Sequence, residues 1–399
     1  MDMKRKILGA FVFVLLIVQL CACGNAPSNQ IEGTTIDLQN VEEEAFIVDA
    51  ESLAYEEGVD AQAFLYGAEV TKGEEGYYFW DEISQDGLGM LMYYDTKTEQ
   101  SVPLCNKPNC THDNVECNAN FNRACEGGEY FDRTFIQYYD GSVYIMGYDT
   151  QYNVNLYKVA ADGSSYEKCM KLYKAEIASE KDDETGGITE NWLPPKVVIH
   201  RGYVYYLIRQ ESTPTIRRIR LGGDETETVY VASGDYPSID WLKFYGDHLF
   251  FCMTNYENEE YESYDSGIVQ VDLNTGESSL IKKGNVDDFV VYNQKLFYST
   301  EDGVNCMDFE TQEDKNIVTN NMMYSRVAVD DNYIYVYNWD YSTLNAYSYN
   351  GEMVASVVDE KVGNCWMGDD QFFFARGTSE KELINLTDFV HGDGKWQSM

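Results

Sequence analysis

Short runs of aromatic and aliphatic residues recur along the chain, each just after a turn rich in Gly, Asn or Asp. The runs are too short for helices, and their large aromatic and β-branched residues favour strands. They occupy residues 77–80, 143–146, 203–207, 249–252, 296–298, 333–337 and 371–374. The preceding turns are Glu75-Gly76, Asp140-Gly141, Arg201-Gly202, Gly246-Asp247, Asn293-Gln294, Asp331-Asn332 and Asp369-Asp370.

A further strand and a polar turn follow the aromatic runs, as in Val269–Gly276 and Ala346–Gly351. Their closing residues tolerate positive φ, which is the signal of a hairpin. The last four intervals between turns are about 44, 47, 38 and 38 residues, close to the roughly 40 to 50 of a four-stranded propeller blade. The pattern therefore predicts an all-β fold, a β-propeller of four-stranded blades over residues 61–399. Seven blades are expected, with six and eight as alternatives.

Two insertions interrupt the early repeats, around residues 105–130 and 174–195. Lys174–Asp182, in the second insertion, has the one stretch of helical periodicity. Ahead of the repeats, residues 23–60 are polar and acidic and are expected to be a tether. Within them, the apolar run Ala45–Val48 allows a second interpretation, in which it closes the ring by adding a strand to the last blade.

The N-terminus has the features of an export signal. Basic residues at positions 4–6 precede the mostly apolar Ile7–Leu20, which suits a secretory signal better than a spanning helix of about 20 residues. Leu20, Ala22, Cys23 and Gly24 resemble a bacterial lipobox. Residues 1–22 are therefore expected to be removed, and Cys23 to carry diacylglyceryl. Two acyl chains provide stable anchoring to the outer face of the cytoplasmic membrane.

The charge narrows the choice of partners. With 29 Lys and Arg against 68 Asp and Glu, the chain has a formal net charge of -39. Such a surface repels nucleic acid and bare anionic membrane, but it tolerates cations, basic peptides and neutral glycans. The acidic residues are spread along the chain rather than gathered in a tail.

The first insertion holds Cys105, Cys110, His112, Cys117 and Cys125 within 21 residues. Two disulfides that staple the insertion are the preferred interpretation, and the sequence leaves their pairing open. The second is a structural Zn²⁺ held by Cys105, Cys110, His112 and Cys117, or by Cys125 in place of Cys117; free thiols are the third. Against zinc, the spacing C-x4-C-x-H-x4-C matches no common finger, and Cys110 and His112 are close together for two ligands of one ion.

The remaining groups predict no catalytic site. Cys169, Cys252, Cys306 and Cys365 stand singly in different repeats and are expected to be buried thiols. The sequence lacks a nucleophile elbow, a zinc-protease helix motif, a phosphate loop and a dinucleotide fingerprint. His200 and His248 lie beside turns and are expected to be solvated.

The chain resembles propeller-like surface lipoproteins of anaerobic Gram-positive bacteria. The resemblance rests on the lipobox, on the stretch Pro103–His112 and on the Tyr-rich repeats. It implies the fold and an extracellular location, and it assigns no activity.

The expected function is that of a non-catalytic binding or scaffold propeller for a glycan, peptide or protein partner. Candidate contact loops are Tyr256–Tyr261 and Asn338–Tyr341. The alternative is a surface enzyme that acts on polysaccharide, because 68 acidic residues supply many carboxylate pairs.

Overall fold

The computed structural model describes most of the chain beyond residue 32. The described ranges are 33–48, 50–61, 70–82, 89–114, 116–121, 130–175, 178–181, 188–191, 196–210, 213–258, 264–319, 325–338, 342–360, 362, 365–367, 372–376 and 381–399. The predicted signal peptide, Cys23 and Cys125 lie outside them. In the described part, no helix has the length and apolar character needed to cross a bilayer.

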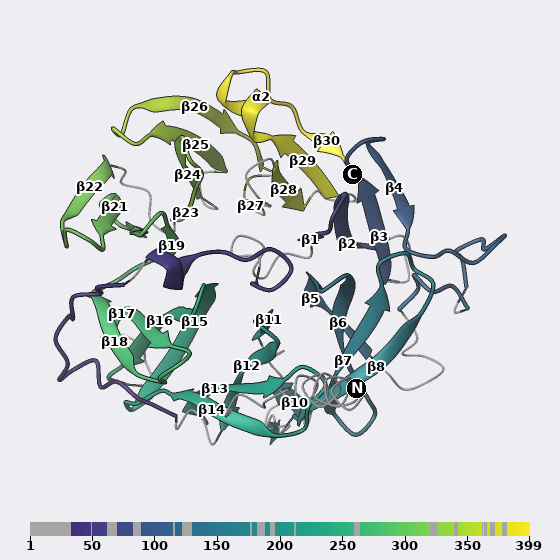
Figure 1. Cartoon of the computed structure of the whole chain (residues 1–399), viewed down its shortest axis with the longest axis horizontal. Coiled ribbons are helices and arrows are strands. Elements are labelled where there is room, and N and C mark those ends of the chain that lie inside the picture. The colour runs from purple at the N-terminus through teal and green to yellow at the C-terminus, as the bar shows by residue number, and fades with distance from the viewer. Residues whose placement is uncertain are drawn as a thin grey trace, which may run out of the picture.

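The described residues form seven four-stranded antiparallel sheets, arranged as the blades of a β-propeller (Figure 1). Each sheet is built from four consecutive strands. The first three blades are β1 Val70–Lys72, β2 Gly76–Glu82, β3 Gly89–Asp95 and β4 Gln100–Pro103; β5 Tyr130–Tyr139, β6 Ser142–Tyr148, β7 Asn153–Ala160 and β8 Tyr166–Lys174; and β11 Lys196–His200, β12 Tyr203–Gln210, β13 Thr213–Arg220 and β14 Thr226–Val231.

The last four blades follow the same order. They are β15 Tyr236–Tyr245, β16 His248–Tyr256, β17 Tyr264–Asp272 and β18 Ser278–Lys283; β19 Asp288–Tyr292, β20 Lys295–Thr300, β21 Gly303–Asp308 and β22 Asp314–Thr319; β23 Ser325–Val329, β24 Tyr333–Asn338, β25 Thr343–Ser348 and β26 Met353–Val358; and β27 Cys365–Met367, β28 Phe372–Arg376, β29 Lys381–Asn385 and β30 Gln397–Ser398. The predicted architecture is thus confirmed, and the aromatic runs are the second strand of each blade.

The turns between first and second strands have the backbone that the sequence predicts. Asp140 and Gly141 have φ of 45° and 71°, Arg201 and Gly202 have 47° and 77°, and Asn293 and Gln294 have 45° and 59°. Two successive residues with positive φ make the tight turn whose twist matches that of antiparallel strands.

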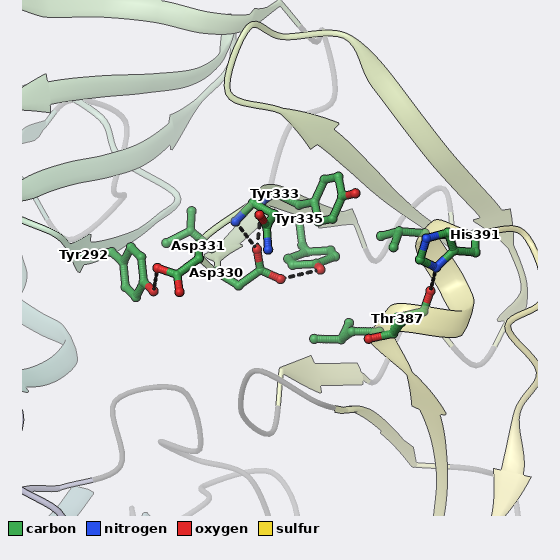
Figure 2. A pocket seen from close by; sticks show the side chains of 11 residues that line it. Tyr292, Asp330, Asp331, Tyr333, Tyr335, Thr387 and His391 are labelled. Atoms are coloured by element: carbon green, nitrogen blue, oxygen red, sulfur yellow. Dashed lines mark hydrogen bonds between the residues drawn. The ribbon is translucent and has the colours of Figure 1, made fainter.

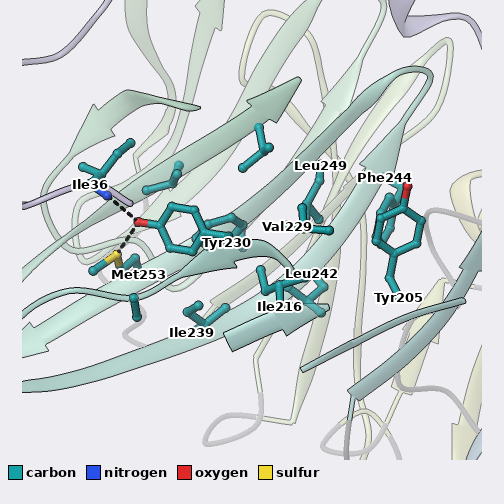
Figure 3. Close-up of a cluster of buried hydrophobic side chains, with 14 of the residues drawn as sticks. Ile36, Tyr205, Ile216, Val229, Tyr230, Ile239, Leu242, Phe244, Leu249 and Met253 are labelled. Atoms are coloured by element: carbon teal, nitrogen blue, oxygen red, sulfur yellow. Dashed lines mark hydrogen bonds between the residues drawn. The ribbon is translucent and has the colours of Figure 1, made fainter. Parts of the chain in front are cut away.

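The core lies between blades. Seven apolar clusters of described residues each join two neighbouring blades, and one of them closes the ring between the first and last blades through Leu383 of β29. Tyr and Phe contribute large rings to every one of these interfaces, among a greater number of aliphatic side chains. In the cluster of Figure 3, Tyr230 of the third blade packs against Phe251 of the fourth with ring centroids 4.8 Å apart.

In the second insertion, the described residues of Lys174–Asp182, the one stretch with helical periodicity, mostly form strands. β8 extends to Lys174, and Ala178–Lys181 (β9) pairs with Ile188–Asn191 (β10) as a two-stranded sheet. The weak helical periodicity therefore belongs to the end of one strand and the start of another.

The N-terminal segment, residues 33–61, lies against the third, fourth and fifth blades (Figure 1, purple). Thr34 pairs with Tyr230 of β14, and Ile36 and Leu38 are buried in the cluster between the third and fourth blades. Phe46 is buried between the fourth and fifth blades, 4.8 Å from the Phe309 ring. The ring-closing interpretation of Ala45–Val48 is therefore wrong, since these residues form no strand and lie far along the ring from the last blade.

Beyond Phe46, the segment runs over the turns between first and second strands. The 3₁₀-helix η1, Ala50–Leu53, rests on the turn of the fourth blade, where the Asp247 amide donates to the Ser52 carbonyl at 2.8 Å. An added Cβ at Gly246 would lie 1.9 Å from that carbonyl oxygen, so glycine permits the close approach. Asp60, 4% exposed, accepts from Arg201 Nε at 2.6 Å in the third blade.

Candidate metal centre

The chain after β4 forms a compact loop on the outer edge of the first blade. Residues 119–121 continue that edge alongside the start of β3, with the Leu91 amide donating to the Ala119 carbonyl at 2.9 Å and a bridge between Met90 and Asn120. We call residues 104–121 the cysteine loop. It leaves the sheet at Leu104 and returns to it at Phe121, so both of its ends are fixed by the blade.

The cysteine loop brings together Cys105, Cys110, His112 and Cys117. One ligand atom from each residue lies within 4.8 Å of all the others, and His112 Nδ1 is 3.2 Å from Cys117 Sγ. Two sulfur ligands on a tetrahedral Zn²⁺ lie about 3.8 Å apart, given Zn–S bonds of about 2.3 Å. A shift of roughly an ångström in side-chain position therefore completes the coordination sphere.

Left-handed backbone conformations solve the spacing problem between Cys110 and His112. Asn109 and His112 have φ of 60° and 58°. The first turns the chain sharply before Cys110, and the second directs the imidazole back beside the cysteines. The ligand atoms of Cys110 and His112 therefore come within 4.8 Å of one another in spite of the short spacing.

Backbone amides already point at the sulfur atoms. The amide of Lys107, two residues beyond Cys105, and the amide of Asn118 hydrogen-bond to the Cys105 sulfur; the amide of Ala119, two residues beyond Cys117, does the same there. Partial burial acts to raise the pKa of Cys105, but these amides and the neighbouring thiols outweigh it and lower that pKa.

The pKa of Cys117 shifts in the opposite direction. Burial raises the pKa of the Cys117 thiol, and the adjacent sulfurs of Cys105 and Cys110 add to the rise. Without a cation, the Cys105 thiol therefore loses its proton at a lower pH than the Cys117 thiol. A bound divalent cation would favour the thiolate form of every coordinated cysteine, because coordinated thiols lose their protons.

The structure bears on each interpretation of the cysteines. Among the described residues, Cys105, Cys110 and Cys117 are free thiols, so no disulfide joins any two of them. The preferred disulfide interpretation thus finds no pair here, and its fourth member, Cys125, falls outside the described ranges. The four grouped residues could hold a metal ion such as Zn²⁺.

The predictions for the other cysteines are confirmed in part, and those for His200 and His248 are wrong. Cys252 and Cys306 are buried as expected, whereas Cys169 is half-buried. His200 and His248 are 0% and 5% exposed, so the prediction of solvated side chains is wrong. Both are covered by the N-terminal segment, which the sequence does not place over them.

Neither predicted contact loop is described in full. In Tyr256–Tyr261 the structure describes the first three residues. In Asn338–Tyr341 it describes Asn338 alone, which ends β24 and is 0% exposed. That asparagine is thus part of the sheet and is unavailable to a ligand.

A pocket of about 400 Å³ lies elsewhere, where the fifth, sixth and seventh blades meet (Figure 2). It is lined by Tyr292 at the end of β19, by the β23–β24 turn and by the short helix α2, Leu386–Val390. The sequence marks the turn at Asp331-Asn332 but gives no sign that three blades converge there, so this pocket was not predicted.

The pocket's carboxylates hold the turn together. Asp330 accepts hydrogen bonds from the Asn332 and Tyr333 amides and from the Tyr335 hydroxyl, each at 2.7 Å. The Tyr292 hydroxyl donates to Asp331 at 2.7 Å. Burial and the adjacent carboxylate raise the pKa of Tyr335, so its hydroxyl stays protonated and continues to donate.

His391 borders the other side of the pocket. Its Nδ1–H donates to the Thr387 carbonyl at 2.7 Å, and in this tautomer Nε2 is the ring's acceptor. Three tyrosines, two carboxylates, an asparagine and a histidine give the pocket aromatic faces together with groups that accept hydrogen bonds. This chemistry suits a hydroxyl-rich or cationic ligand, and it repels anions.

Comparisons with known proteins add support for the fold alone. No family model and no curated protein matches the sequence. Among solved structures, puromycin hydrolase is 12% identical with a TM-score of 0.52, and a prolyl endopeptidase is 12% identical with a TM-score of 0.51. The chain covers 53% and 50% of the lengths of those two proteins, while 83% and 84% of this chain are aligned.

Proposed function

We propose that the protein is a lipid-anchored protein of the outer face of the cytoplasmic membrane, whose propeller binds a partner without catalysing a reaction. The partner is a neutral glycan, a basic peptide or a basic protein surface. The observation that carries the binding role is the pocket between the last three blades, which combines Tyr292, Tyr333 and Tyr335 with Asp330 and Asp331.

The pocket favours binding over catalysis because its carboxylates already accept hydrogen bonds from neighbouring residues. Asp330 accepts three hydrogen bonds from its own turn and from Tyr335. A carboxylate whose oxygens are engaged by its own turn is poorly placed to exchange a proton with a substrate. Glycoside cleavage needs two carboxyl groups that both reach the glycosidic bond.

The test is an array of glycans and basic peptides probed with the mature chain. We expect binding that Tyr333→Ala weakens by about tenfold, equivalent to about 1.4 kcal/mol. Tyr152→Ala, which removes an exposed tyrosine from the second blade, serves as the control and should bind normally. Equal binding by both variants would place the contact elsewhere, and turnover of an arrayed polysaccharide would favour the surface enzyme instead.

Anchoring at Cys23 is tested separately. The first described residue, Gly33, lies ten residues beyond Cys23, a span of at most about 35 Å when extended. The proposed anchor therefore holds the propeller close to the membrane, on the side of the third and fourth blades. Cys23→Ala should release the chain into the medium, and its continued presence in the membrane fraction would contradict lipidation.

We also infer that the four grouped residues of the cysteine loop bind a structural Zn²⁺. Three sulfurs and one imidazole nitrogen fill all four tetrahedral positions, which leaves none for a substrate or a reactive water. The loop's amide–sulfur hydrogen bonds stabilise thiolates and orient them, as supporting groups around metal ligands generally do.

A further inference from the structure

We propose that the zinc-bound cysteine loop is a clasp that fixes the first blade between its two neighbours and so closes the ring. This inference rests on the structural Zn²⁺ proposed above, and it adds a role for that ion. Each blade is made of four consecutive strands, so no strand is shared across the ring closure. The first and last blades are therefore joined by packing between two complete sheets.

One side of the clasp faces the last blade. Cys117 and Ala119 are 0% exposed and belong to the apolar cluster that contains Met90 and Met92 of β3 and Leu383 of β29. Cys105, Cys110 and the C-terminal Met399 pack against the same cluster. The Met399 amide donates to the Lys381 carbonyl at 2.9 Å, which holds the chain end at this interface.

The other side of the clasp faces the second blade. Asn118, 6% exposed, directs its side-chain amide to the carbonyls of Gly163 and Ser164 at 2.8 and 2.9 Å. These residues form the turn between β7 and β8. Leu104 and Phe121, the two ends of the loop, are buried in the cluster between the first and second blades.

The clasp contacts flank the metal ligands directly along the chain. Asn118 and Ala119 follow directly after Cys117, and Leu104 directly precedes Cys105. The amides of Asn118 and Ala119 are also the donors to the sulfurs of Cys105 and Cys117. An ion that fixes the sulfurs therefore fixes the residues that contact the second and last blades.

The ion also replaces an unfavourable arrangement. Without an ion, three sulfurs and an imidazole lie within 4.8 Å of one another at the edge of an apolar cluster, and thiolates there would repel one another. Zn²⁺ provides each sulfur with a bond and offsets two of the three thiolate charges. The loop is therefore expected to be ordered against both neighbours when zinc is bound, and to loosen from them when zinc is removed.

The experiment is hydrogen exchange on the mature chain, purified with reductant and with zinc, before and after a strong chelator. We expect about one zinc per chain. Chelation should speed exchange by about tenfold or more in the 161–164 turn and in residues 381–399, while β19–β22, on the opposite part of the ring, keep their rates. His112→Gln should reproduce the chelated pattern, and Cys169→Ser should behave as the wild type.

His112→Gln serves as the main variant because its half-buried position makes misfolding less of a concern than at Cys117. If zinc binds but chelation changes exchange only within residues 104–121, or equally in every blade, the clasp is wrong while the metal site stands. If the purified chain binds less than about a tenth of an equivalent of added zinc, the proposed metal site itself is wrong.

Discussion

The N-terminal segment and the cysteine loop are both added to the blades, and they are held in different ways. The N-terminal segment is held by contacts with residues up to 266 positions away, such as the bond from Gln312 to the Phe46 carbonyl. The cysteine loop is organised by residues within about a dozen positions of one another. A segment held by distant partners looks like a tether in the sequence, whereas a locally organised loop shows itself as a motif.

The two segments also differ in what would release them. The N-terminal segment depends on apolar residues buried between blades and, near its end, on the ion pair of Asp60 with Arg201. The cysteine loop depends, in our proposal, on one ion with four ligands. Its attachment should therefore respond to metal and reductant, while that of the N-terminal segment should respond to acid and to single charge deletions.

The largest expected effect is the loss of a buried sulfur ligand. Cys117→Ser should lower the free energy of unfolding by about 4 kcal/mol, because it removes a zinc–sulfur bond and leaves a hydroxyl in an apolar cluster. Urea unfolding with zinc present measures this change. The diagnostic control is the chelator, which should destabilise the wild type and leave the variant nearly unaffected; an equal response of both proteins would argue against a metal.

The second-largest expected effect is the loss of stability on removal of the Asp60 charge. Asp60→Asn should cost about 3 kcal/mol, since it leaves the Arg201 guanidinium without its main partner beside a buried site. The same substitution weakens the bond from the Glu56 amide to Asp60, at 2.9 Å. Protease sensitivity should appear within residues 33–61, while the cysteine loop stays intact. Asp37→Asn, on the exposed part of the segment, is the control and should change little.

A pH effect of about 2 kcal/mol is expected from His200. Its Nδ1 accepts from the Ala61 amide at 3.1 Å, and its Nε2–H donates to the Gly246 carbonyl at 2.7 Å, so the ring is neutral. Burial lowers its pKa from 6.5 to about 4, although Asp60, with an oxygen 3.8 Å away, acts in the other direction. The unfolded chain therefore binds this proton first, and the stability contributed by His200 is complete above pH 6.5 and decreases as the pH falls toward 4.

The measurement compares urea unfolding at pH 7.5 and 5 for the wild type and for His200→Gln, which does not titrate. The wild type should lose about 2 kcal/mol more than the variant over this interval. His391→Gln, at the exposed pocket histidine, should follow the wild type. If His200→Gln shows the same pH dependence as the wild type, the ring is not the group that titrates.

These residues also show which features of the fold and of the candidate sites could be predicted from the sequence. The propeller was predictable because the turn residues recur with regular spacing, and Asp140-Gly141 and Arg201-Gly202 adopt the positive φ that their position demands. The metal ligands were predictable because four of them fall in one short loop. The burial of His200 was not, because the residues that cover it come from a segment about 140 positions earlier in the chain. The pocket at Asp331 was hidden for the same reason, since three separate blades build it.

The smallest expected effect tests whether Gly246 and Gly163 are needed for the close approach of another segment or only for their positive φ. Gly246 and Gly163 both have positive φ, and each lies under one of the two added segments: a Cβ at Gly246 would meet the Ser52 carbonyl at 1.9 Å, and one at Gly163 would meet the Leu104 carbonyl carbon at 2.5 Å. Gly141→Ala is the matched control, because it also has positive φ but nothing lies within 4 Å of the new methyl group. The control should cost about 1 kcal/mol from backbone strain alone.

Gly246→Ala and Gly163→Ala should each cost about 1 kcal/mol more than that control, because the contacting atoms belong to backbone and must move. The excess costs of the two variants should differ both in where hydrogen exchange becomes faster and in how they respond to zinc. For Gly246→Ala it should be accompanied by faster hydrogen exchange at residues 50–61, and it should be indifferent to zinc. For Gly163→Ala it should appear at residues 104–121 and shrink when zinc is removed, because the ion is what holds the Leu104 and Cys105 backbone against the new methyl group. If both variants responded equally to zinc, the N-terminal segment and the cysteine loop would be coupled through the ring, and their separate modes of attachment would have to be abandoned.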